Sequence, residues 1–237
     1  MPRIFVRILN KLFKKSLYRL QKITWWQLLC EALTRQSRVI KFVQIGANDG
    51  VQFDSLFFTV TSGGWVGIVV EPLKDLFDRL AANYQDYPSV TPVNVALHPT
   101  KNEEKIYRVG KDYLSNYPAW AAGIASMDKF HLLRHNIKEE HINCETVHCK
   151  SLMSLLTEYK FLSADVLQID TEGFDAEVIK MIDFSRFRPA MIKFEWMNLS
   201  AGDQQGVKEL LQNEGYTFRV EPDGADAVAW IASKISP

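Results

Sequence analysis

The stretch that decides the fold of this 237-residue chain is residues 39–50, VIKFVQIGANDG. An apolar run rich in β-branched and aromatic side chains reaches Gly46, and a second glycine, Gly50, closes the stretch. Such side chains favour strands, whereas glycine permits conformations and close approaches that a Cβ would block. The stretch therefore predicts a buried parallel strand that turns tightly into a helix.

A second apolar run, residues 65–70, ends at Glu71. A glycine turn after one strand and an acid at the tip of the next is typical of a nucleoside site, because the acid accepts hydrogen bonds from ribose hydroxyls. The glycines do not follow G-x-G-x-x-G, and no Tyr-x-x-x-Lys pair stands at a site, which counts against a nicotinamide-dependent dehydrogenase.

Strands alternate with helices along the rest of the chain, which predicts an α/β domain over residues 36–237 with a doubly wound, mostly parallel sheet. The last two strands are close in sequence and predict an antiparallel hairpin at one edge. Further strands are expected at 90–97, 105–109, 144–149, 164–169, 190–194, 216–220 and 227–232, and helices at 25–35, 53–60, from 72 to about 87, and at 127–134, 152–159, 174–181 and 204–213.

Residues 110–143 mix aromatic residues with glycine and proline. An irregular excursion of this length inside a compact domain is typical of a lid or substrate loop. The alternative is a surface loop packed by its own aromatic side chains.

Residues 1–35 form an N-terminal extension, and its part from 3 to 22 has the pattern of a basic amphipathic helix. Residues 1–30 contain seven Lys and Arg and no acid. One interpretation is a helix lying on an anionic membrane surface. The alternatives are a helix that packs on its own domain and a mitochondrial targeting segment.

The composition is that of an ordinary globular protein, with 47% hydrophobic and 24% charged residues. The formal net charge is zero, so no global field argues for nucleic acid. Three cysteines without C-x-x-C spacing do not suggest a disulfide framework. No apolar run approaches about 18 residues. We therefore expect a cytoplasmic protein, with peripheral membrane contact through residues 3–22 as an extension of that expectation.

Polar side chains collect at the predicted carboxyl ends of the strands, where ligands bind in open α/β sheets. This pattern favours a nucleoside cofactor, although a single acid such as Asp170 could instead cap a helix. The residues are Asn48, Asp49, Glu71, Asn94, Asp170, Glu172 and Glu195.

Four motifs together resemble those of FkbM-family S-adenosylmethionine-dependent methyltransferases: VQIGANDG (43–50), VEP (70–72), NVAL (94–97) and LQIDTEGFD (167–175). The resemblance spans about residues 38–232, and it implies a class I methyltransferase fold: a Rossmann-like seven-stranded sheet whose last strand is antiparallel. It also implies S-adenosylmethionine as methyl donor and O-methylation of a hydroxyl on a sugar, glycan or secondary metabolite. The alternative is a catalytically degenerate module that binds a membrane or partner through its N-terminal helix.

The same resemblance implies roles for the cofactor-binding residues. The turn containing Gly46 and Gly50 would face the methionine part of the cofactor, and Asn48 and Asp49 would hydrogen-bond its amino-acid group, directly or through water. Glu71 would hold the ribose hydroxyls. The segment from Asn94 to Leu97, including Ala96, would lie near the adenine.

Methyl transfer to a hydroxyl requires removal of its proton or stabilisation of its oxyanion. One arrangement uses Asp170 or Glu172 as the base. The other uses Asp170 and Glu195 to hold Mg²⁺, which would lower the hydroxyl pKa.

Six histidines and cysteines crowd into residues 131–149. A zinc site is one interpretation, and coincidence is another. A third is that His131 or His135 contributes to acceptor chemistry from the lid, and we select His135 as the candidate.

Overall fold

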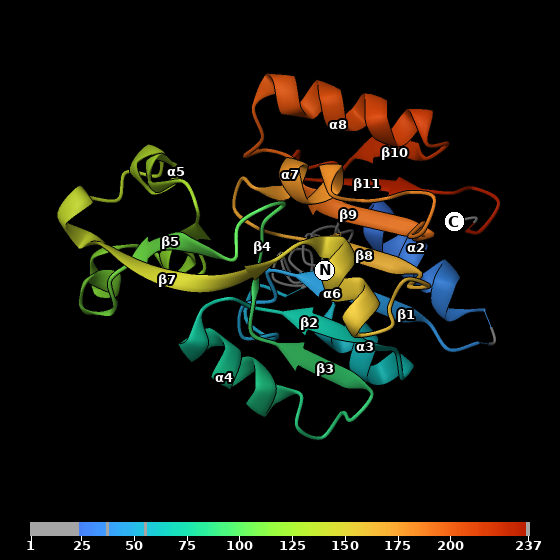
Figure 1. Cartoon of the computed structure of the whole chain (residues 1–237), viewed down its shortest axis with the longest axis horizontal. Helices are drawn as coiled ribbons and strands as arrows, with labels where there is room; N and C mark the ends of the chain where they lie inside the picture. The colour runs from blue at the N-terminus through green and yellow to red at the C-terminus, as the bar shows by residue number, and fades with distance from the viewer. Residues whose placement is uncertain (1–23, 37, 55, 236–237) are drawn as a thin grey trace, which may run out of the picture.

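The computed structural model describes residues 24–36, 38–54 and 56–235 (Figure 1). The predicted basic helix over 3–22 lies outside these residues. The predicted helix over 25–35 is confirmed as α2 (Trp25–Thr34), which begins with a reciprocal capping box between Thr24 and Gln27.

A seven-stranded sheet forms the centre of the fold, in the order β10-β11-β9-β8-β1-β2-β3. The five strands from β9 to β3 are parallel, and β11 runs antiparallel to both of its neighbours. The strand bounds are β1 (Lys41–Ile45), β2 (Val66–Val70), β3 (Val90–Val93), β8 (Val166–Ile169), β9 (Met191–Glu195), β10 (Thr217–Val220) and β11 (Asp226–Trp230). The predicted doubly wound sheet with an antiparallel hairpin is therefore confirmed.

Helices cover both faces of this sheet, because alternate side chains of each buried strand point to opposite sides. Phe42 of β1 packs with α2, α3 (Phe57–Gly63) and α4 (Lys74–Asn83). Val43 packs in the other core. That core also contains the buried faces of α6 (Leu152–Glu158), α7 (Asp175–Lys180) and α8 (Ala201–Asn213).

Residues 96–150 form a second, four-stranded sheet that extends from the carboxyl ends of the central strands (Figure 1). Its bounds are β4 (Ala96–Leu97), β5 (Glu103–Val109), β6 (Ala125–Ser126) and β7 (Ile142–Lys150), with α5 (Lys129–Arg134) and the short helices η1 (Lys111–Asn116), η2 (Ala119–Ala122) and η3 (Glu139–His141) between strands. We call residues 96–150 the insertion. It has an apolar cluster of its own around Val109, Ile124 and Leu132.

Two element predictions were wrong in detail. The single strand expected over 90–97 is interrupted, and its second part, β4, leaves the central sheet and pairs with β7. The helix expected from residue 53 starts four residues later, at Phe57. Phe53 has a left-handed φ of 65°, and the Asp54 carboxylate accepts a hydrogen bond from the Leu56 amide (2.7 Å), so these residues form a turn.

Among the described residues, no helix combines the length and apolar character needed to cross a bilayer.

Candidate active site

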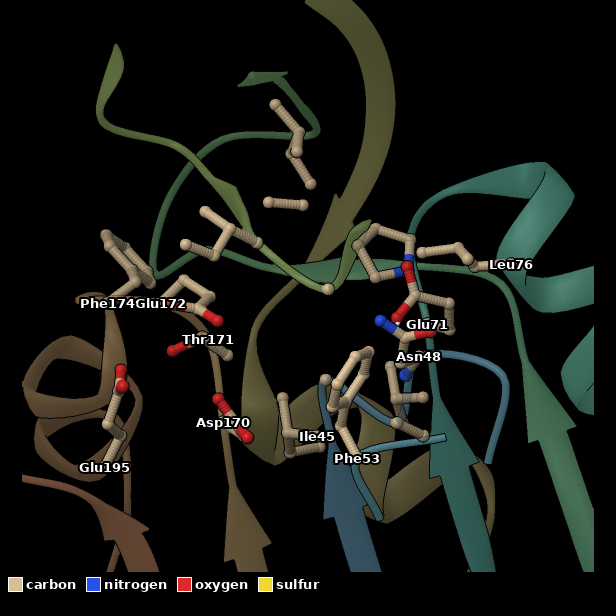
Figure 2. Close-up of a pocket in the computed structure, with 18 of the residues that line it drawn as sticks. Ile45, Asn48, Phe53, Glu71, Leu76, Asp170, Thr171, Glu172, Phe174 and Glu195 are labelled. Carbon is tan, nitrogen blue, oxygen red and sulfur yellow. Dashed lines mark hydrogen bonds between the residues drawn. The ribbon is translucent and has the colours of Figure 1, made fainter. Parts of the chain in front are cut away.

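A cavity of about 410 Å³ opens at the carboxyl ends of β1, β2, β8 and β9. A volume of this size suits a small-molecule ligand. Figure 2 shows Glu71 and Asn48 on one side of it and Asp170, Glu172 and Glu195 on the other. The insertion supplies the remaining wall, which includes Trp120, Ile124, Met127 and His135.

The turn after β1 fits against β8 only because residue 46 is glycine. Its φ is +76°, and an added Cβ would lie 1.7 Å from the carbonyl oxygen of Asp170. The amides of Gly46 and Ala47 both donate to the carbonyl of Val70. The main chain therefore brings the ends of β1, β2 and β8 together at the floor of the cavity.

Glu71 is buried where β2 ends and lines the cavity. Its two carboxylate oxygens accept hydrogen bonds from the amides of Asn48 and Leu73, each at 2.9 Å. Burial outweighs these bonds and raises the pKa of Glu71 to about 7. Each oxygen keeps acceptor capacity towards the cavity, as a diol-binding carboxylate requires.

Of the seven predicted cofactor residues, four line the cavity: Gly46, Asn48, Glu71 and Ala96. The structure does not bring Asp49, Gly50 or Asn94 to its wall. The Asp49 carboxylate accepts hydrogen bonds from the amides of Val51 and Gln52 (3.0 and 2.7 Å), so it caps its own turn.

Gly50 and Asn94 contact other parts of the protein rather than the cavity. An added Cβ on Gly50 would lie 2.5 Å from the Leu80 side chain of α4. The Asn94 side-chain amide donates to the carbonyls of Glu71 and Pro72 (2.8 and 2.9 Å) and so holds the turn that carries Glu71. The structure thus places Asp49, Gly50 and Asn94 behind the wall of the cavity, where they support it, because strand-tip spacing locates a loop but not the direction of each side chain.

The three predicted acids at the far side, Asp170, Glu172 and Glu195, all line the cavity. Glu172 has a left-handed φ of 52°. Its carboxylate lies 3.1 Å from Nε2 of His131 and 3.4 Å from the amide nitrogen of Asn198. Asn198 also donates to Glu195 (2.6 Å). A continuous polar network thus joins β8, β9 and the insertion.

The pKa values of two of these acids are raised. Burial, followed by the charges of Asp175 and Glu172, raises the pKa of Asp170 well above its ordinary value. The Asp170 side chain is accessible from the cavity, but protein surrounds the cavity, so the carboxylate still loses bulk hydration. Burial, with Glu172 and Asp170 nearby, raises the pKa of Glu195 to about 9.

The floor of the cavity contains unpartnered acceptors that the sequence did not reveal. Four buried oxygens that line it have no hydrogen-bond partner among the described residues: Oε1 of Gln44, Oδ2 of Asp54, Oε1 of Gln168 and Oε2 of Glu195. Buried acceptors without partners are unfavourable, so the floor suits a ligand rich in N–H or O–H donors. Gln44 and Gln168 stand two residues before Gly46 and Asp170, and the two-residue period of a strand would have placed them on the same face.

His131 of α5 and His135, which caps the end of that helix, occupy different positions. His131 is buried against Glu172, whereas His135 lines the cavity. The two rings lie 4.8 Å apart between centroids. Burial, followed by the neighbouring His131, holds the pKa of His135 below its ordinary value, so this ring is neutral at pH 7 and able to accept a proton.

A zinc site in residues 131–149 finds no support. Within the described ranges, no group of three His, Cys, Asp or Glu side chains is arranged to hold a metal ion. His148 is instead an exposed residue of β7, and His141 stacks on Tyr113 with ring centroids 4.1 Å apart.

Both the sequence and the fold are similar to those of known methyltransferases. The family model described as "Methyltransferase FkbM domain" matches residues 44–220. The structure of a methyltransferase FkbM from Methylobacillus flagellatus KT has 14% identity and a TM-score of 0.51, over 81% of this chain and 43% of that one. The likeness to that structure shows the fold, the class I methyltransferase fold.

Two other solved structures are similar at lower scores. The METTL16 methyltransferase domain has 15% identity and a TM-score of 0.47, over 85% of this chain and 64% of that one. The N-terminal domain of human METTL16 in complex with SAH has 16% identity and a TM-score of 0.42, over 85% and 66%. No curated protein matches the sequence significantly.

Proposed function

The chain belongs to the FkbM methyltransferase family, and from that premise we propose that it transfers a methyl group from S-adenosylmethionine to a hydroxyl of a sugar, glycan or secondary metabolite. The observation that carries this proposal is the cavity at the strand ends. One side of the cavity holds the buried carboxylate of Glu71. The rest of it offers acidic side chains and buried oxygens that can accept hydrogen bonds from a ligand.

The residues present fit this cofactor. Its ribose hydroxyls match the free acceptor capacity of Glu71, and its adenine matches the apolar stretch formed by Val95, Ala96 and Leu97 together with Leu76. Its ammonium group carries three donors, which suit the unpartnered oxygens of Gln44, Asp54 and Gln168. When bound, it would supply a methyl group on a sulfonium centre that an oxygen nucleophile can attack.

The chain's own residues would orient the acceptor and remove its proton. Asp170 is suited to the role of base, because its carboxylate faces the cavity and its raised pKa makes it a stronger proton acceptor than an ordinary aspartate. Glu172 is less free, since His131 and Asn198 contact its carboxylate. His135 is a second candidate, neutral at pH 7 and placed on the insertion's side of the cavity.

The base mechanism is preferred to one that uses Mg²⁺. A magnesium site at Asp170 and Glu195 would need further oxygen ligands, and Asn198 already donates its amide to Glu195. A magnesium titration of the purified protein tests the choice directly, because the metal mechanism requires binding that Asp170→Asn abolishes.

The first test is calorimetric titration with S-adenosylmethionine. We expect micromolar binding that Glu71→Gln weakens by about tenfold, the worth of one or two hydrogen bonds to a charged acceptor. A thermal melt of the variant separates lost binding from lost folding, since Glu71 also caps two amides. Absence of binding to the folded wild-type protein would overturn the proposal and favour the degenerate, surface-binding module.

A further inference from the structure

Exposed apolar side chains gather at the edge of the central sheet where the cavity opens. Phe53 follows β1, Met197 follows β9 and Trp120 belongs to the insertion. They are 57%, 62% and 41% exposed, and all three line the cavity. We call these three residues the apolar rim. Val39, which is 61% exposed, lies before β1 at the opposite edge of the sheet.

The chain enters the described structure at the same edge. The Glu221 carboxylate accepts hydrogen bonds from the amides of Trp25 and Trp26, at 2.9 and 2.7 Å. Glu221 follows β10, in the hairpin turn that leads to β11. The amide of Met197 donates to the carbonyl of Ala225 in that turn (3.0 Å). The first described residues therefore lie on the same turn that contacts Met197 of the apolar rim.

The composition of the joining segment complements this placement. Residues 1–22 carry seven Lys and Arg and no Asp or Glu. The rest of the chain holds the other 21 basic residues and all 28 acids, so its formal charge is −7. A basic, apolar segment is attracted to anionic lipid, whereas a negative domain is not. Attachment of the protein to a membrane would thus depend on residues 1–22, and the orientation of the domain on the membrane would depend on the apolar rim.

We propose that the edge carrying the cavity is a membrane-docking surface. Residues 1–23 bind an anionic bilayer, the apolar rim inserts at its interface, and the cavity opens towards the lipid. The consequence for the substrate rests on the proposed function. If the protein methylates a hydroxyl, that hydroxyl belongs to a membrane-borne molecule, such as a lipid-linked glycan, rather than to a freely diffusing one.

Sedimentation of the full chain with vesicles tests the proposal. We expect binding to phosphatidylcholine vesicles that contain phosphatidylglycerol and little binding to phosphatidylcholine alone. Replacing Lys11, Lys14 and Lys15 by Gln is expected to weaken binding by about tenfold or more, because each cation near an anionic surface contributes. Met197→Ser and Val39→Ser form a matched pair of equal exposure at opposite edges, and only Met197→Ser is expected to weaken binding, by about threefold to tenfold.

Several outcomes would overturn the inference. They are failure of the wild type to bind the anionic vesicles, equal effects of Met197→Ser and Val39→Ser, and unchanged binding after the three lysine substitutions. Equal effects of the two serine variants would mean that the domain is tethered to the membrane without a fixed orientation. Unchanged binding after the lysine substitutions would mean that the N-terminal segment packs on its own domain. Cofactor titration of the same preparation is independent: cofactor binding without vesicle binding would refute the docking surface and leave the methyltransferase proposal standing.

Discussion

The cavity has two walls that are held in place by different means. In the strand-end wall, formed by Gly46, Glu71 and Asp170, the main chain sets the positions: Gly46 packs on the carbonyl of Asp170, and Glu71 binds two backbone amides. In the insertion wall, formed by Trp120, Met127 and His135, side-chain contacts set them.

Polar side chains tie the insertion to the central domain, and Lys111, which lies 2.9 Å from the Asp75 carboxylate, is one of them. Arg108 of β5 pairs with Asp75 of α4 at 2.6 Å. His131 contacts the Glu172 carboxylate at 3.1 Å, and Ser126 donates to the Glu172 carbonyl at 2.7 Å. The strand-end wall should therefore be intolerant of change, whereas the insertion wall should loosen without unfolding the domain.

The largest effect is expected at Gly46. Gly46→Ala puts a Cβ 1.7 Å from a backbone oxygen, which forces β1 and β8 apart and should cost more than about 4 kcal/mol of unfolding free energy. Gly64→Ala is the matched control, since φ is +62° but no atom lies within 4 Å of the added Cβ. The control should lose about 1–2 kcal/mol. Chemical denaturation measures both, and equal losses would mean that φ rather than the close approach makes glycine necessary.

The strand-end wall is also the part that the sequence predicts well, because its signals are local. A two-residue apolar period, a glycine at a strand end and an acid at a strand tip lie within single short motifs such as 43–50 and 70–72. The structure places Gly46, Glu71 and Asp170 from these motifs in the wall of one cavity. The motifs do not give side-chain direction: Asp49 caps its own turn, and Asn94 holds the turn that carries Glu71.

The insertion could be predicted only as an irregular segment between two strands. Its sheet depends on pairing of β5 with β7, far apart in the chain, and its attachment depends on a contact between His131 and Glu172 across 41 residues. No local pattern encodes either. The strand over 90–97 was misjudged for the same reason, because only the pairing with β7 draws β4 out of the central sheet.

The second largest effect is expected where the insertion meets α4. Arg108→Leu removes one partner of an ion pair in which the Arg108 side chain is 8% exposed, and should cost about 2–3 kcal/mol. Hydrogen exchange should quicken in residues 103–150 while β1, β2 and β8 stay protected. Lys74→Gln, which breaks an exposed pair with Asp78 on the same helix, should change little. Uniform loss of protection over both sheets would contradict the independence of the two walls.

A smaller effect on stability is expected at His131. The His131→Asn variant tests whether cofactor binding depends on the contact between the insertion and Glu172. His131→Asn removes a buried contact to Glu172 and should lower the unfolding free energy by about 1–2 kcal/mol. Affinity for S-adenosylmethionine should stay within about twofold, because Glu71 and the apolar residues near Ala96 are untouched. Calorimetry alongside Glu71→Gln checks this, and a loss of affinity as large as that of Glu71→Gln would show that the contact between His131 and Glu172 helps to form the cofactor site.

The smallest effect concerns Glu195, which Asn198 connects to Glu172 and so to the junction of the two walls. Its pKa of about 9 in the folded protein exceeds the value of about 4.3 in an unfolded chain. Between these values the folded state binds more protons, so stability should fall as pH rises from about 5 to 9. The pKa of Glu71, raised to about 7, adds to this slope in the lower part of the range.

Glu195→Gln removes one of these titrations. The melting temperature of the variant should therefore decline less than that of the wild type between pH 6 and pH 9, by about a few degrees for a domain of this size. Glu209→Gln, on the exposed side of α8, should keep the wild-type slope. Parallel curves for wild type and Glu195→Gln would place the raised proton affinity on another member of the cluster, and Asp170, the candidate base, would be the next residue to substitute.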